Sequence, residues 1–231
     1  MTSAACELWY LRAPATDTPA DLALSALTAE ERHRALTRPA GPTAVLSTAT
    51  RIALRTLLGR RLGRAPSEVV LLRRRCPRCA GPHGKPALSA GQGHRLHFSV
   101  SHSAGRALLA VAATAVGIDV QGPLSQRTAD TCAQALHPLE QQDLSRLEGR
   151  HRTIEFARLW TRKEAYLKAV GTGLAHGLRG NYLGSRLALR PSGWTVTDLD
   201  TTATHTAAVA LALPTAVVPP LREVPAHRLL P

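Results

Sequence analysis

The 231-residue sequence has few aromatic residues, few cysteines and fewer acidic than basic side chains. Aromatic residues make up 3% of the chain, too few for a surface that stacks the bases of single-stranded nucleic acid. Four cysteines do not predict a disulfide scaffold, so we expect a reducing compartment, the cytoplasm. No apolar run reaches the roughly 18 residues that cross a membrane. The first residues also lack the charged-then-apolar layout of a secretory signal, so we expect no membrane association.

The shortage of acidic residues leaves a formal net charge of +13. Such a charge attracts polyanions, and nucleic acid, an acidic protein and a polyphosphate cofactor all fit it. Arg51 and Arg55 are four residues apart in a predicted helix over 43–62, so they share one helix face. That face is equally compatible with simple solvation. Charge alone therefore identifies no ligand.

Hydrophobic residues make up 44% of the chain, enough for a sizeable core. Thr28 with Glu31 forms a helix-starting capping box, and apolar residues at three- and four-residue spacing predict a helix over 154–170. Alternating or short apolar runs predict strands at 7–11, 69–72, 96–101, 107–113, 116–120, 187–189, 194–196 and 207–213. The tail from Pro214 is expected to be loosely held. Both halves mix helices with strands, so we expect an α+β fold of two similar lobes that meet at 113–115.

Three polar groups interrupt this apolar structure. Ser101-His102-Ser103 ends one predicted strand, and Asp119 lies inside another, where a carboxylate is costly unless it is paired or bound to a metal. Glu164 and Lys168 lie one helical turn apart, so they share a face. A carboxylate pair from Asp119 and Glu164 would suit Mg2+, and Lys168 could neutralise a phosphate. A turn-capping aspartate and an ordinary Glu–Lys helix pair are the alternatives.

Taken together and in order, these segments resemble the motifs of Sfp-type 4'-phosphopantetheinyl transferases. The segments are 98–103 (FSVSHS), 117–121 (GIDVQ) and 156–173 (FARLWTRKEAYLKAVGTG), with Gly84-Lys85-Pro86 upstream resembling a further basic motif. The resemblance implies two pseudo-symmetric α/β lobes, 1–114 and 115–231, with coenzyme A and Mg2+ in the cleft between them. It also implies transfer of the 4'-phosphopantetheine arm of coenzyme A to a serine of an apo acyl or peptidyl carrier protein, in fatty-acid, polyketide or nonribosomal-peptide synthesis.

By motif position, the resemblance assigns roles to individual residues. Asp119, Gln121 and Glu164 match the metal-binding positions, and Glu164, Lys168 and His102 match the catalytic ones. The residues matching coenzyme A contacts are Arg34, Arg51, Lys85, Ser101, His102, Lys163 and Lys168, with Arg34 and Arg51 resting on loose N-terminal similarity. A monomer is expected, because two lobes of one chain can form the cleft. Carrier proteins are usually acidic, and the +13 charge suits such a partner.

Two departures keep rival interpretations open. Gln121 stands where the family pattern commonly has a glutamate, so the chain could instead be a catalytically weakened module that binds coenzyme A or a carrier protein. Cys76-Pro77-Arg78-Cys79 is half a structural zinc site, which His83 with Cys132 or Cys6 could complete, although a loop without metal is favoured. A nucleic-acid-binding protein is disfavoured by the low aromatic content and by the absence of a complete finger pattern.

Overall fold

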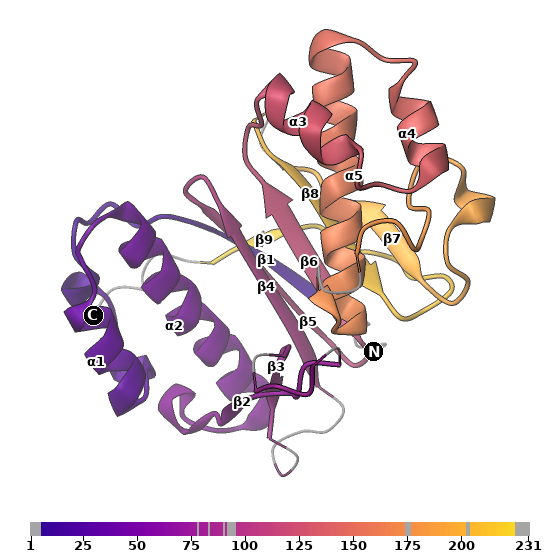
Figure 1. The fold of residues 1–231 in the computed structure, drawn as a ribbon. Helices are drawn as coiled ribbons and strands as arrows, with labels where there is room; N and C mark the ends of the chain where they lie inside the picture. The colour runs from indigo at the N-terminus through magenta and orange to yellow at the C-terminus, as the bar shows by residue number, and fades with distance from the viewer. Residues whose placement is uncertain are drawn as a thin grey trace.

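The computed structural model describes residues 6–77, 79–82, 84–89, 91, 96–173, 177–201 and 204–224 (Figure 1). Its helices are α1 (Ala29–Thr37), α2 (Pro42–Leu62), α3 (Gln126–Ala133), α4 (Pro138–Leu144) and α5 (Gly149–Val170). Its strands are β1 (Cys6–Arg12), β2 (Leu71–Arg73), β3 (Pro86–Leu88), β4 (His97–Ser103), β5 (Arg106–Ala112), β6 (Val116–Gln121), β7 (Thr195–Asp198), β8 (Thr206–Leu211) and β9 (Arg222–Glu223). None of the helices in these ranges is long and apolar enough to cross a membrane. The α+β class predicted from the sequence is confirmed.

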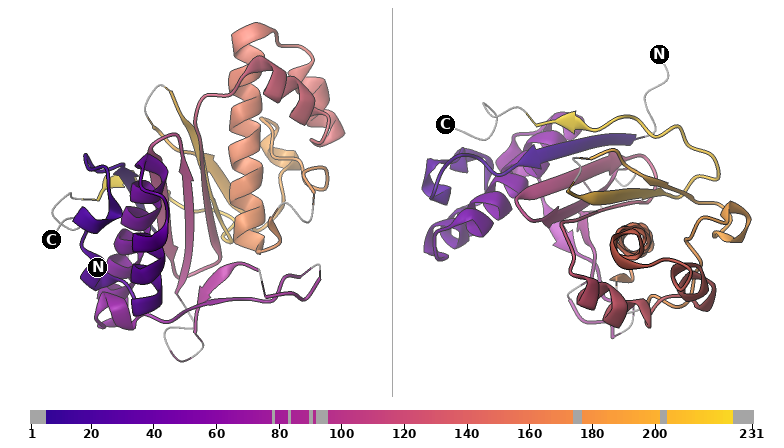
Figure 2. Two further views of the ribbon diagram at one scale, coloured as in Figure 1. Left: turned by 60° about the vertical axis from the view of Figure 1, so that its left-hand side comes forward. Right: turned by 90° about the horizontal axis from the view of Figure 1, so that it is seen from above.

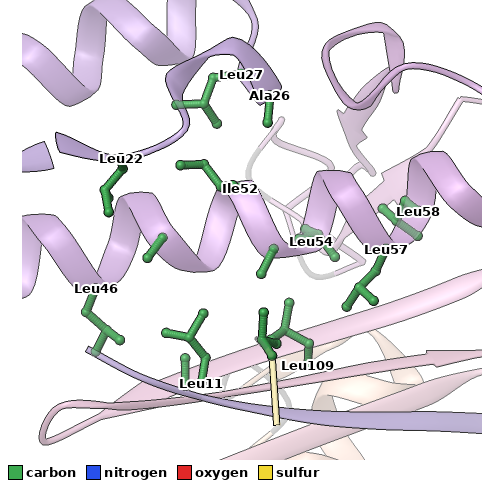
Figure 3. Close-up of a cluster of buried hydrophobic side chains, with 14 of the residues drawn as sticks. Leu11, Leu22, Ala26, Leu27, Leu46, Ile52, Leu54, Leu57, Leu58 and Leu109 are labelled. Carbon is green, nitrogen blue, oxygen red and sulfur yellow. The ribbon is translucent and has the colours of Figure 1, made fainter. Parts of the chain in front are cut away.

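The first sheet has the strand order β4-β5-β1-β9, and α2 covers one of its faces. Strand alternation explains this cover, because Ala107, Leu109 and Val111 of β5 all project toward α2. Figure 3 shows the resulting core, in which Leu46 and Leu57 of the helix lie on the side of Leu11 and Leu109, whereas Ile52 projects from the opposite side of the helix toward Leu22 and Leu27. This core holds α2 at a fixed position relative to β4.

The second sheet has the order β6-β8-β7, and α5 lies across it. Gly117 permits the close approach of helix and strand, because a Cβ there would lie 1.9 Å from the carbonyl oxygen of Ala165. Any larger residue at 117 would therefore push α5 off β6. The glycine that opens the 117–121 motif is thus required for packing.

The two sheets also pack against each other. Leu108 and Ala110 of β5 share a core with Ile118 and Val120 of β6. The layers therefore run from α2 through two sheets to α5, and the two long helices lie on opposite sides of the sheets (Figure 2). The resemblance of one lobe to the other, and the division at 114/115, remain predictions.

Two predicted features are wrong. Residues 187–189 form a 3-10 turn instead of a strand, and Leu187 is 71% exposed, so this short apolar run has no sheet to join. The tail is not free throughout, because β9 pairs in parallel with β1 and so returns the chain to the first sheet. By contrast, the capping box of Thr28 and Glu31 is present as predicted.

Candidate active site between β4, β6 and α5

The polar side chains of β6 lie on the face of the strand that is turned toward α5. Gly117 faces the helix, so Asp119 and Gln121, two and four residues on, project from the same side of the strand. Ile118 and Val120 point the other way, into the core between the sheets. This alternation brings the 117–121 motif against the helix that carries the other predicted site residues.

Helix α5 supplies Lys168 to Asp119. The Lys168 Nζ donates to Asp119 Oδ1 at 2.6 Å and to Ser101 Oγ at 3.0 Å. Ser101 Oγ in turn donates to the same Asp119 oxygen at 2.6 Å. Burial raises the pKa of Asp119, while the Lys168 ammonium and the Ser101 hydroxyl act in the opposite direction. Three of the predicted residues, from β4, β6 and α5, thus form one hydrogen-bonded cluster.

Glu164 lies one turn before Lys168 and is half-buried. Burial, and then the negative charge of Asp119, raise the pKa of Glu164. Two carboxylates that repel each other in a partly buried position are the arrangement that a divalent cation would stabilise. Gln121 Nε2 donates to the carbonyl of Gly122 at 3.3 Å. The side-chain amide oxygen of Gln121 could therefore serve as a further metal ligand.

These residues fit Mg2+ better than a softer metal. Mg2+ takes oxygen ligands and typically one or two protein carboxylates, with phosphate oxygens and water completing its shell. Asp119 and Glu164 would provide the carboxylates, and Gln121 a neutral oxygen. In the described ranges there is no cluster of three or more His, Cys, Asp or Glu side chains suited to a metal. A complete cage of such side chains is therefore not formed among the described residues.

A cavity of about 560 Å³ lies beside this cluster, between α1, α2, the 84–86 segment, β4 and the end of α5. Its lining is notable for positive charge. The basic residues that line it are Arg34, Arg38, Arg51, Lys85, His102 and Lys168. Five of these six were predicted from the sequence as site residues. Arg38 was missed, although it lies four residues after Arg34, at the end of α1.

Lys85 joins the cavity wall to the second sheet and α5. Its Nζ donates to the carbonyl of Val116 at 2.9 Å and to that of Ala169 at 3.3 Å. Burial and the charge of Arg74 lower the pKa of Lys85 to about 8. The carbonyl of Ala169 is in the last turn of α5, where the helix dipole also favours a cation.

Lys163 is not part of this arrangement. Its Nζ forms a buried ion pair with Glu140 at 2.8 Å and donates to the carbonyl of Leu178 at 2.6 Å. Because a residue five positions from Lys168 is rotated by about 140° around the helix, Lys163 points to α4 instead of β6. We therefore do not carry Lys163 forward as a cofactor contact.

The cysteines that could complete a zinc site are dispersed. Cys76 is buried and lines the cavity, and Cys79 is exposed. Cys6 belongs to the core between the sheets, while Cys132 packs beside the α5 core. His83 lies outside the described residues. No zinc site is assembled among the described cysteines.

Comparison with known proteins agrees with the motifs. Residues 115–210 match the sequence profile of the 4'-phosphopantetheinyl transferase superfamily. The chain is similar to 4'-phosphopantetheinyl transferases. The matched region contains β6 and α5, and with them Asp119, Gln121, Glu164 and Lys168. The resemblance predicted from the sequence is confirmed by this match.

Individual relatives show how far the similarity extends. HetI of Nostoc sp., a 4'-phosphopantetheinyl transferase, is 37% identical over 133 residues, which are 55% of this chain and 52% of HetI. The 4'-phosphopantetheinyl transferase gsp of Aneurinibacillus migulanus is 31% identical over 130 residues, 53% of this chain and 50% of gsp. The Bacillus subtilis 4'-phosphopantetheinyl transferase is 32% identical over 93 residues, 40% of each chain. The aligned regions thus span about half the length of these relatives or less.

Proposed function

We propose that this protein transfers the 4'-phosphopantetheine arm of coenzyme A to a serine of an apo acyl or peptidyl carrier protein. The observation that carries the proposal is the cluster of Asp119, Lys168 and Ser101, with Glu164 beside it, at the edge of a cavity lined by cations. Two carboxylates and several cations are the groups that transfer of a phosphate-linked arm requires. The similarity to 4'-phosphopantetheinyl transferases supports the same reaction.

Coenzyme A would occupy the cavity through its phosphates. Arg34 and Arg51 line the end of the cavity at α1 and α2 and suit a terminal phosphate, since guanidinium groups bind phosphate oxygens in pairs. Lys85, His102 and Lys168 lie toward β4 and α5, where a pyrophosphate would approach the carboxylates. Ser101 would act beside them through its bonds to Lys168 and Asp119.

In this proposal Asp119 and Glu164 hold Mg2+, with Gln121 as a neutral oxygen donor. The bound cation would neutralise charge on the pyrophosphate and thereby make its bridging bond easier to break. Lys168 remains paired with Asp119 and adds positive charge on the same side. Because both carboxylates are required to hold the cation, loss of either should abolish turnover.

The proposed transfer balances as a displacement at phosphorus. The carrier serine oxygen bonds to the phosphorus that bears the pantetheine arm, and the bond from that phosphorus to the bridging oxygen breaks. Adenosine 3',5'-bisphosphate leaves with the bridging oxygen. The serine proton passes to Glu164, which acts as the general base.

The partner is proposed from charge. A carrier protein with an acidic surface would be drawn to a chain with a net charge of +13, which raises the rate of encounter. We propose that the protein acts as a monomer, since both sides of the cavity come from one chain. The small number of cysteines is consistent with action in the cytoplasm.

A second candidate function is a binding module that holds coenzyme A or a carrier protein without turnover. Gln121 favours it, because a neutral amide replaces one negative charge expected at the metal. The pairing of Asp119 with Lys168, and the nearby Glu164, favour catalysis. The two functions differ in whether the arm is transferred.

The deciding experiment is intact-protein mass spectrometry of an apo carrier protein incubated with the protein, coenzyme A and Mg2+. We expect the carrier to gain the mass of one phosphopantetheine arm. The gain should be lost with Glu164→Ala and without Mg2+, but kept with Glu155→Gln, which removes a carboxylate from the same helix where it pairs with Arg158 and Arg162. Binding of coenzyme A without any mass gain, across several carrier types, would establish the binding module instead.

A further inference from the structure

Strands β4 and β6 are edge strands of different sheets, and they lie side by side (Figure 1). Strand β4 pairs by its backbone with β5, and β6 pairs with β8. In the described part of the chain, no backbone ladder joins β4 to β6. The proposed site nevertheless depends on this junction, since His102 comes from β4 and Asp119 from β6.

Side-chain hydroxyls of alternate serines bridge the junction. Ser99 Oγ accepts a hydrogen bond from the backbone N–H of Ile118 at 3.1 Å. Four residues on, Ser103 Oγ accepts one from the backbone N–H of Gly122, also at 3.1 Å. The offset is four residues along each segment, with Gly122 directly after the end of β6, so the two bonds lie on either side of the contact between Ser101 and Asp119.

Alternate side chains of β4 point in two different directions. The even-numbered residues Phe98, Val100 and His102 line the cavity. The odd-numbered serines direct their hydroxyls to β6, although Ser99 also borders the cavity. Ser99 is 6% exposed, and Ile118 is fully buried. An N–H buried at this depth needs a partner, and the hydroxyl supplies it where no neighbouring strand does.

We propose that Ser99 and Ser103 are positioning residues that fix β6 against β4 and so hold Asp119 beside Ser101 and Lys168. This inference rests on the proposed transfer function for its kinetic consequence. The hydrophobic core between the sheets fixes their distance, but apolar packing is not directional. The two hydrogen bonds fix the position of β6 along β4, and with it the position of the carboxylate.

The test uses the full chain with the double variant Ser99→Ala plus Ser103→Ala. Amide hydrogen exchange, followed residue by residue by NMR, should become faster at Ile118 and Gly122. The kcat of transfer should fall by about 100-fold, because a small misplacement of reacting groups has effects of that order. The KM for coenzyme A should change little, since the basic residues that line the cavity remain. The Mg2+ affinity, measured by NMR titration, should fall.

Matched variants separate positioning from a general loss of stability. Thr195→Val also removes a hydroxyl that accepts from one backbone N–H, that of Ala216, and donates to one carbonyl, that of Leu213. Thr195 lies on β7, across the sheet from β6, so this variant should lower the melting temperature but leave kcat unchanged. Ser103→Thr keeps the hydroxyl and should restore kcat relative to Ser103→Ala.

The outcomes are distinguishable. Wild-type kcat in the double variant, or unchanged exchange at Ile118 and Gly122, would overturn the positioning role. An equal fall of kcat in Thr195→Val would overturn it too, because the effect would then follow stability. If the wild-type protein transfers nothing, the proposed function fails, and the serines are judged by exchange and Mg2+ affinity: unchanged values reject the inference, and the expected changes support it.

Discussion

The two long helices α2 and α5 each carry a pair of charged residues four positions apart, yet the two pairs make different contacts. On α5, Glu164 and Lys168 both reach the cluster around Asp119. On α2, only Arg51 lines the cavity, whereas Arg55 is 2% exposed and buried in the fold. The same spacing therefore predicts a shared helix face, but it does not predict what that face contacts.

The difference arises from what packs against each turn. Arg55 Nε lies 2.5 Å from Glu31 Oε2, and its Nη1 donates to the carbonyls of Pro66 and Val69. Burial opposes the charge of Glu31, but the hydrogen bond and charge of Arg55 hold the pKa of Glu31 below its ordinary value. Arg55 thus ties α1 and the 66–69 turn to α2. By contrast, Lys168 donates to Asp119 of β6, and the charge of Asp119 also acts on Glu164.

The strongest test of this difference uses the two lysines of α5. Lys163→Met should lower the free energy of unfolding by about 3–5 kcal/mol, because it leaves the fully buried Glu140 without its ion-pair partner. Lys168→Met should in addition lower the rate of transfer by the folded protein by about 100-fold, because it removes positive charge at the reacting pyrophosphate. Urea denaturation and the carrier-protein mass assay measure the two effects.

The two lysines serve as controls for each other. Folded Lys163→Met should transfer at close to the wild-type rate. Lys168→Met removes the ion-pair partner of the buried Asp119 and should also lower the free energy of unfolding, but the part of it that is folded should transfer slowly. A large loss of activity in folded Lys163→Met would return that residue to the site and contradict its assignment as a structural lysine.

A second test uses the arginine pair of α2. Arg55→Met should lower the free energy of unfolding by about 3 kcal/mol, since it breaks a buried ion pair and removes the hydrogen bonds that Arg55 donates to two carbonyls. Arg51→Met should raise the KM for coenzyme A by about tenfold, as expected when one charged contact to a phosphate is lost. Equal effects of the two substitutions on KM would show that Arg55 also reaches the cofactor.

Much of the candidate-site arrangement could be predicted from the sequence because the residues that form it lie in regular elements. Period-two alternation places Asp119 and Gln121 on one face of β6, and the 3.6-residue period places Glu164 and Lys168 on one face of α5. Gly117 then brings the two faces together. Residue type alone is less informative within a helix. The sequence does not distinguish the roles of Lys163 and Lys168, which become different only when the position of Glu140 is known.

Contacts between distant segments could not be predicted in this way. The return of β9 to β1 depends on long-range pairing that a two-residue strand does not signal. Arg38 enters the cavity because α1 ends there, and helix ends are poorly fixed by sequence alone. The serines of β4 read as polar strand residues, and their partners across the junction appear only when β6 is in place.

A smaller effect is expected from pH, through Lys85. Its pKa of about 8 lies below the value of 10.5 for an unperturbed lysine, because burial and Arg74 disfavour the charged form. Between these two values the unfolded chain binds more protons than the folded one, so the contribution of Lys85 to stability rises with pH in that window. Affinity for coenzyme A should fall over the same window as the ammonium is lost.

The measurement compares wild type with Lys85→Met. The difference between their melting temperatures should change in favour of the wild type from pH 8 to pH 10, since only the wild type carries this titration. Calorimetric titration with coenzyme A should show an affinity that declines in the wild type and is flatter in the variant. Parallel curves would show that Lys85 does not titrate at its contacts with Val116 and Ala169.

The smallest expected effect concerns Gln121, which stands where the family pattern commonly has a glutamate. Gln121→Glu would add a third negative charge beside Asp119 and Glu164, so the concentration of Mg2+ that gives half-maximal transfer should fall several-fold. Without Mg2+, the added repulsion should lower the melting temperature, and Mg2+ should restore it, because a ligand that binds the folded state stabilises it. Gln121→Met, which lacks the amide oxygen, should change Mg2+ dependence in the opposite direction. An unchanged Mg2+ dependence in Gln121→Glu would show that residue 121 does not influence the cation, and that Asp119 and Glu164 set its affinity by themselves.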